Sequence, residues 1–94
     1  MEQLIDAIKN WHYDRNLIEG SDEKTQTLKM MSEAGELCDN VAKGKDITDD
    51  VGDIMVVLIN LTDRRGITLY DCLDHAYNDI KHRKGKMVNG TFVK

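Results

Sequence analysis

Apolar positions along the chain recur every three or four residues, which is the spacing of helices that bury one face. Breaks at Gly20, Gly44 and Gly66 divide this pattern into four segments. The segments predict helices over about 2–16, about 22–43, from a cap at Asp46 or Thr48 to about 65, and from Thr68 to about 83. We therefore expect an all-α chain.

Polar residues with capping chemistry stand where these helices are expected to begin. Ser21 and Asp22 are N-cap candidates for the second helix. Thr68 is followed three residues later by Asp71, which is a short-chain variant of the capping box. Beyond the fourth helix, residues 85–94 contain two glycines between short apolar pairs. A turn, a short hairpin or a short extension is expected there.

The third expected helix stands out because residues Ile54–Ile59 are apolar without a break. Such a run also suits a buried strand, but caps about 18 residues apart enclose a segment too long for a typical strand. A helix that is apolar all round has to be covered on every side. A chain of 94 residues has little surface for that purpose. We expect a four-helix bundle completed by oligomerisation, as a dimer or a dimer of dimers.

Composition narrows the class of protein. Charged residues make up 32% of the chain and apolar residues 40%, a balance typical of a globular protein. The absence of proline and the presence of only five aromatic residues argue against an all-β fold. The formal net charge of −4 disfavours binding to a nucleic-acid duplex.

No apolar stretch approaches the roughly 18 residues that cross a bilayer, and the N-terminal segment MEQLIDAIKN lacks a signal pattern. We therefore expect a cytoplasmic protein without a membrane partner. Cys38 and Cys72 are expected to be reduced and packed among apolar residues.

Acidic residues stand in polar stripes on the second and third expected helices. The stripes are Lys29, Glu33, Glu36 and Asn40 on the second helix, and Asp50, Asp53, Val57 and Asn60 on the third. A carboxylate on an otherwise buried helix is costly unless it is paired or bound to a metal, and no lysine or arginine lies between Asp46 and Thr62.

Helices joined by a short loop pack antiparallel, so these stripes can meet. Four carboxylates in a small volume repel one another, and we expect the pKa of at least one to be raised. Oxygen-only ligands favour Mg²⁺, Mn²⁺ or Ca²⁺ over zinc. The alternative is that both acidic pairs are ordinary solvated helix faces. The apolar run around the second pair favours the metal site.

The segment LKMMSEAGELCDNVAKGKDITDDVGDIMVVLINL resembles the signature of the MazG-like, all-α nucleoside triphosphate pyrophosphohydrolases. Their pattern is E-E-x-x-E, a spacer, and E-x-x-D followed by an apolar helix. The flanking segments WHYDRNL and KHRKGKMVNGTFVK are similar to small single-domain members of phages and bacteria. The resemblance implies one MazG-like four-helix domain over residues 1–94, with a turn or short extension at 85–94. If phage-encoded, the protein would act in the host cytoplasm.

The resemblance also implies a set of metal ligands, namely Glu33, Glu36, Asp50 and Asp53. The implied ion is Mg²⁺, with Mn²⁺ as a substitute. Two positions depart from the family pattern, because Ser32 replaces its first Glu and Asp50 replaces the Glu of E-x-x-D. The first departure bears on the number of ions or on the residue that activates water. The second shortens the reach of position 50, so Asp50 is expected to coordinate through a water molecule.

The implied reaction is hydrolysis of the α–β phosphoanhydride of (deoxy)nucleoside triphosphates to a monophosphate and pyrophosphate, in nucleotide-pool house-cleaning. Either Glu33 or Glu36 would accept the proton of the attacking water. The alternative function is that of a catalytically weak homologue, an oligomeric helical binding or regulatory module. Ser32 is the residue that keeps this alternative open.

Candidate substrate contacts fall in three places. Lys29 lies one turn before Glu33 and can grip phosphate or pair with that acid. The basic end of the fourth helix is either a phosphate grip or a solvated end favoured by the helix dipole; it contains Asn78, Lys81, Arg83 and Lys84. Asn60 is either a contact to the base or sugar or a satisfied polar residue of the bundle. Trp11 is expected to pack in the core rather than stack on a base.

Overall fold

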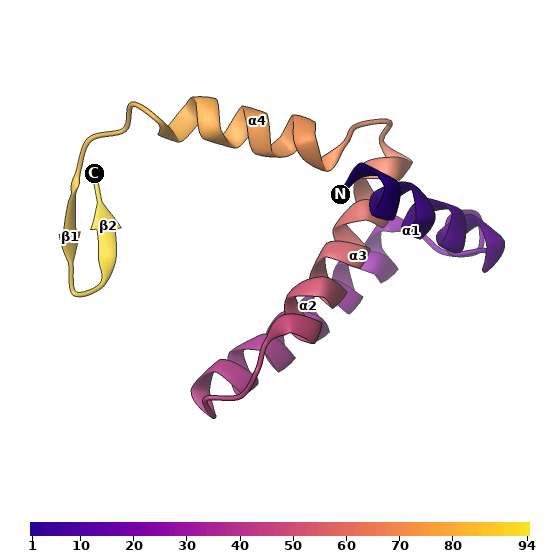
Figure 1. Ribbon diagram of the computed structural model, residues 1–94, viewed down its shortest axis with the longest axis horizontal. Helices are drawn as coiled ribbons and strands as arrows, with labels where there is room; N and C mark the ends of the chain where they lie inside the picture. Colours follow the sequence, from indigo (N-terminus) through magenta and orange to yellow (C-terminus); the bar gives the residue numbers. More distant parts are fainter.

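All 94 residues are described by the computed structural model, which confirms the all-α prediction. Four helices are followed by a small antiparallel hairpin (Figure 1). The elements are α1 (Glu2–Asp14), α2 (Glu23–Ala42), α3 (Thr48–Arg64), α4 (Leu69–Ile80), β1 (Lys86–Val88) and β2 (Thr91–Val93). None of the helices combines the length and the apolar character that crossing a membrane requires.

The centre of the molecule is the antiparallel pair of α2 and α3, joined by a loop over residues 43–47 (Figure 1). Helix α1 packs across α3 near the end of the pair that lies away from this loop. Val57 and Ile59 of the apolar run of α3 are the buried apolar residues of the core. Packing of α2 against α3 brings together the two polar stripes, as their spacing predicts.

Helix starts follow the expected capping chemistry at two of three places. The carboxylate of Asp22 accepts a hydrogen bond from the backbone N–H of Thr25 at 2.7 Å. Thr68 and Asp71 form a reciprocal capping box. The prediction of Asp46 or Thr48 as the cap of α3 is wrong, because the N-cap is Ile47, which offers no side-chain acceptor. Asp46 instead accepts from the backbone N–H of Thr48 at 3.3 Å, just ahead of the helix.

A polar network fastens the loop between α1 and α2 onto α3. Asn60 is fully buried, and its amide donates to the carbonyl oxygen of Leu17 at 3.0 Å. The guanidinium of Arg64 donates to the Asn60 side-chain oxygen and to the same carbonyl, both at 2.7 Å. Both ends of the Asn60 amide are therefore used inside the chain.

The C-terminal part of the chain leaves the helical body. Figure 1 shows α4 leading away from the end of α3 and the hairpin hanging at the far end of α4. The strands pair in a register that places Met87 opposite Phe92. Asn89 and Gly90 join them with positive φ values of 51° and 82°, which are the values a tight hairpin turn requires. Of the alternatives expected for residues 85–94, the structure has the hairpin.

Large apolar side chains remain uncovered on two of the helices. Leu28 and Met31 of α2 are 67% and 64% exposed, and Leu73 and Tyr77 of α4 are 65% and 61% exposed. Cys38 and Cys72 lie on the same helices and are free and exposed, so the expectation that they pack is wrong for the single chain. Only six of the 94 residues are buried. The single chain therefore leaves much of its apolar surface open to solvent.

Candidate metal centre

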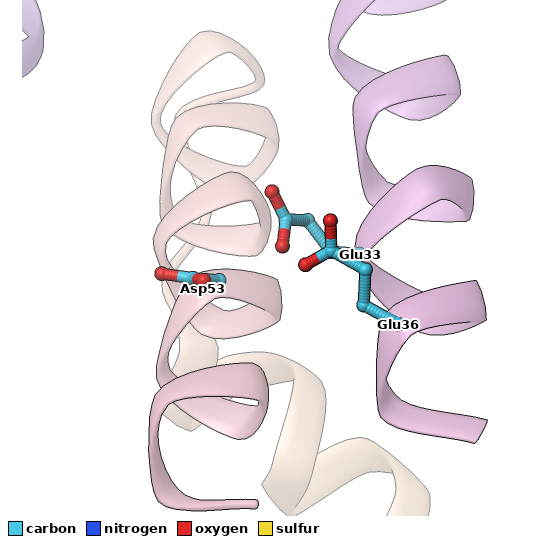
Figure 2. A group of neighbouring side chains, drawn as sticks. All are labelled: Glu33, Glu36 and Asp53. Carbon is cyan, nitrogen blue, oxygen red and sulfur yellow. The ribbon is translucent and has the colours of Figure 1, made fainter. Parts of the chain in front are cut away.

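Three carboxylates from α2 and α3 converge between the two helices. Glu33 and Glu36 are one turn apart on α2, and Asp53 faces them from α3 (Figure 2). Each contributes a carboxylate oxygen, and these oxygens all lie within 4.8 Å of one another. The antiparallel pairing of α2 and α3 creates this group from residues that are 17–20 positions apart in sequence.

The three side chains differ in their exposure. Glu36 is exposed, Asp53 is half-buried, and the side chain of Glu33 is only 12% exposed. One carboxylate oxygen of Glu33, Oε2, is buried without a hydrogen-bond partner. An ionised oxygen in that position is costly unless a cation or a donor reaches it. The group is therefore open to solvent on the Glu36 side and unsatisfied on the Glu33 side.

Mutual repulsion raises the pKa of Glu36. The negative charge of Glu33 is the largest cause, followed by partial loss of solvation and by the charges of Asp50 and Asp53. This confirms the expectation that at least one clustered carboxyl would have a raised pKa. It also shows that Asp50 lies close enough for its charge to act on the group.

Little positive charge is available nearby to offset these acids. The ammonium group of Lys29 lies 3.4 Å from Oε1 of Glu33, but the lysine is exposed and the pair is weak. Hard divalent cations prefer several carboxylate oxygens together with water molecules. The donor set, with its unpartnered Glu33 oxygen, therefore fits Mg²⁺ or Mn²⁺ held by Glu33, Glu36 and Asp53.

Asp50 stands beside this group and not in it. It is buried, and its carboxylate accepts a hydrogen bond from the side-chain amide of Asn40 at 2.9 Å. Sequence reasoning placed Asn40 on the polar stripe but gave it no role. Its spacing after Glu33 and Glu36, on the face that meets α3, was the signal that it could hold an acid of the opposite helix.

The structure places the candidate substrate contacts in three separate regions. Lys29 lies at the acidic group, whereas Asn60 is buried in the network that holds Leu17. The basic end of α4 lies across the molecule from α2 (Figure 1). Its side chains are engaged locally: Asn78 donates to the carbonyl of Asp74, Lys81 donates to Asn78, Arg83 pairs with Asp79, and Lys84 is exposed. Within one chain, only Lys29 joins the acids.

Trp11 departs from its expected place in the core. Its side chain is 43% exposed, and the guanidinium of Arg15 lies 5.0 Å from the centre of its ring. His12 is the residue of this segment that is buried, and its ring forms a T-shaped pair with the ring of Trp11. Burial has lowered the pKa of His12, so the neutral form is favoured there.

Comparison with known proteins finds one matching family and one similar phage protein. The family of the MazG nucleotide pyrophosphohydrolase domain matches residues 21–88, which include the whole of α2, α3 and α4. The chain is also 45% identical over 69 residues to an uncharacterized 18.2 kDa protein in the rep–hol intergenic region of Haemophilus phage HP1 (strain HP1c1). That match covers 71% of this chain and 42% of the phage protein. No solved structure matches the chain.

The raised pKa of Glu36 predicts how metal-free stability depends on pH. The folded state binds more protons than the unfolded state between the ordinary and the raised pKa, so stability falls as pH rises through that window. Glu36→Gln should remove this fall and raise the melting temperature near neutral pH in the presence of EDTA. Asp39→Asn, an exposed acid one turn further along α2, is the control and should follow the wild type. Thermal melts from pH 4 to 8 make the comparison; parallel curves for all three proteins would show that the acids do not repel.

Proposed function

We propose a nucleotide pyrophosphohydrolase activity for this chain because it belongs to the MazG nucleotide pyrophosphohydrolase domain family. The specific reaction proposed is hydrolysis of the α–β linkage of a (deoxy)nucleoside triphosphate to a monophosphate and pyrophosphate. The observation that carries the proposal is the convergence of Glu33, Glu36 and Asp53 from two helices. Phosphoryl transfer depends on neutralising charge and positioning water, which is the chemistry such a group provides.

Glu33, Glu36 and Asp53 would hold the ion, for which Mg²⁺ is the proposed identity and Mn²⁺ a substitute. Such an ion would supply positive charge for the phosphate oxygens and a lowered pKa for a water molecule. The carboxylate of Asp50, fixed by the amide of Asn40, would accept a hydrogen bond from a water molecule at the edge of the group. Asp50 in this proposal supports the site and does not bind the ion directly.

Glu36 is the proposed general base, acting through the carboxylate oxygen that does not bind the ion. It is the exposed member of the group, whereas one oxygen of Glu33 lies beside Lys29 and the other is buried. The attacking water forms a bond to a phosphorus atom of the α–β linkage and gives its proton to the base. The bridging P–O bond breaks, and its electron pair leaves with the product that departs, which is either the monophosphate or pyrophosphate. Lys29 would contact the phosphates, while Asn60 is left out because both ends of its amide are used by the chain.

The biological setting we propose is nucleotide-pool house-cleaning in the cytoplasm, in an infected host if the chain is phage-encoded. Similarity to a protein of Haemophilus phage HP1 supports the phage setting. A second candidate function is a catalytically weak homologue that binds nucleotides or a partner as a helical module. The absence of the leading acid at Ser32 favours this candidate, and binding of nucleotide without release of pyrophosphate would establish it.

Turnover tests the role of the acidic group. With Mg²⁺ and a panel of nucleoside triphosphates, the wild type should release pyrophosphate. Glu36→Gln and Asp53→Asn should each reduce turnover by about a hundredfold or more, because outer partners of a metal site alone are worth about ten- to a hundredfold. Asp39→Asn should retain wild-type turnover, and all variants should keep the wild-type helical circular dichroism. Near wild-type turnover of either site variant at saturating metal would remove that residue from the proposed site.

Self-association is the second part of the proposal. The chain exposes 7404 Å², whereas a compact protein of 10.7 kDa exposes about 5,500 Å². The surplus of about 1,900 Å² exceeds the roughly 800 Å² that each partner loses in a standard interface. The radius of gyration of the chain, 15.8 Å, likewise exceeds the value of about 12 Å for a compact chain of this length. A dimer or a dimer of dimers would cover the exposed faces of α2 and α4.

Light scattering at micromolar concentration tests the assembly. The wild type should have the mass of a dimer or a tetramer. Met31→Asp places a charge on the exposed apolar side of α2 and should shift the mass toward that of one chain. Ser32→Asp, the neighbouring exposed position, is the matched control and should assemble as the wild type does. A wild-type species of 10.7 kDa would contradict the proposal.

A further inference from the structure

Asn40 and Asp50 meet beside the acidic group, which consists of Glu33, Glu36 and Asp53. Asn40 follows Glu36 by four residues on α2, and Asp50 precedes Asp53 by three residues on α3. Both spacings join neighbours on one face of a helix. Because α2 and α3 are antiparallel, one turn forward along α2 corresponds to one turn back along α3 (Figure 1). The two residues therefore continue the polar face that holds the acidic group.

Asp50 depends on Asn40 for its position. It is the only acidic residue of the chain that is buried, with 5% of its surface exposed. None of the ion pairs of the chain includes it. The side-chain amide of Asn40 donates to Oδ2 of Asp50 at 2.9 Å. A hydrogen bond to a charged group is one of the stronger kinds, and a buried carboxylate that loses its donor is costly. The amide therefore fixes where this carboxylate lies.

The charge of Asp50 reaches the acidic group although its oxygens do not belong to it. The pKa of Glu36 is raised first by the charge of Glu33 and by partial loss of solvation. The charge of Asp50 comes next, ahead of that of Asp53. The oxygens that converge within 4.8 Å nevertheless come from the acidic group without Asp50. Asp50 is thus close to the site and is held out of its set of convergent oxygens.

The number of carboxylates around a divalent cation influences which ion is preferred. Ca²⁺ takes about six to eight oxygen ligands in a flexible arrangement, whereas Mg²⁺ requires near-octahedral geometry and keeps several water molecules. A carboxylate added to the three of the acidic group would therefore favour Ca²⁺ and would displace water. Holding one acid aside has the opposite effect.

We propose that Asn40 is a positioning residue that keeps Asp50 out of the ligand set of the acidic group and thereby lowers the affinity of the site for Ca²⁺ relative to Mg²⁺. This inference rests on the proposed function for the presence of the ion, whereas the choice between ions is measured without turnover. A neutral amide holds the carboxylate without adding positive charge beside the ion. Positions that Asp50 does not occupy stay available to water and to phosphate oxygens.

Ion binding to the metal-free protein tests the role of Asn40. Asn40→Ala removes the amide, and Asn40→Leu removes it at similar size, so either variant should release Asp50 toward the acidic group. Calorimetric titrations with Mg²⁺ and with Ca²⁺ should show the ratio of Ca²⁺ to Mg²⁺ affinity rising about tenfold, because outer partners of metal sites change affinity by about ten- to a hundredfold. Cys38→Ala, an exposed position on the same helix, is the control and should keep the wild-type ratio.

A merely structural amide would give a different result. Both Asn40 variants would then lower the melting temperature in EDTA and leave the ratio of affinities unchanged, which would overturn the inference. In an Asp50→Asn background the carboxylate is already gone, so adding Asn40→Ala should leave the ratio unchanged. A rise of the same size with and without the Asp50 carboxylate would also overturn the inference, because Asn40 would then act by another route.

Counting bound water molecules gives a second readout without activity. Tb³⁺ is a hard cation of about the size of Ca²⁺, and its luminescence decay in H₂O and in D₂O reports the water molecules on the ion. The wild type should hold about one water molecule more than Asn40→Ala, because Asp50 takes its place in the variant. Equal hydration of the ion in the two proteins would contradict the proposed displacement.

These readouts separate failure of the inference from failure of the proposed function. Binding of Mg²⁺ with the expected change of ratio, in a protein without turnover, would uphold the role of Asn40 and reject the enzyme. Release of pyrophosphate by the wild type, with an unchanged ratio in both Asn40 variants, would uphold the enzyme and reject the role of Asn40. Failure of the wild type to bind either ion would reject the inference together with the metal site.

Discussion

Mutual repulsion among carboxylates held on two packed helices is the constraint on which the rest of the structure depends. The antiparallel pairing of α2 and α3 places Glu33, Glu36 and Asp53 together, and the raised pKa of Glu36 records the repulsion. Without a compensating interaction, a chain with so small a core would gain by separating these acids. A bound divalent cation reverses the balance, because it turns the same charges into ligands. Under the proposed function, the acidic group would therefore cost stability without the ion and contribute stability with it.

The second constraint is the length of the chain. Its 94 residues form the α2–α3 pair that holds the acids but leave apolar side chains of α2 and α4 exposed. Helix α3 is covered by α1 and α2, with Asn60 and Arg64 holding the connecting loop. Nothing remains to cover the outer side of α2, and α4 leads away from it (Figure 1). The self-association proposed above would cover the exposed apolar residues of both helices.

Local signals predicted the helices, the Asp22 cap, the capping box of Thr68 and Asp71, and the convergence of the acids, because spacing along a helix fixes which residues share a face. Three features depend on tertiary contacts that spacing does not contain. Asn60 is bound to Leu17, 43 residues away. The carboxylate of Asp50 accepts a hydrogen bond from Asn40 of the opposite helix. Helix α4 leads away from the helical pair (Figure 1), and the two cysteines, which were expected to pack, are exposed in the single chain.

Linkage between metal binding and stability tests the central claim that these acids form a divalent-cation site. Thermal and urea unfolding of the wild type and of Asp53→Asn would be compared in EDTA and in Mg²⁺. The wild type should gain about 2.7 kcal/mol at a hundred times its dissociation constant for Mg²⁺, whereas Asp53→Asn should start more stable in EDTA and gain much less. If Mg²⁺ shifts the two proteins equally, the acids are a solvated surface and the account of the site is wrong.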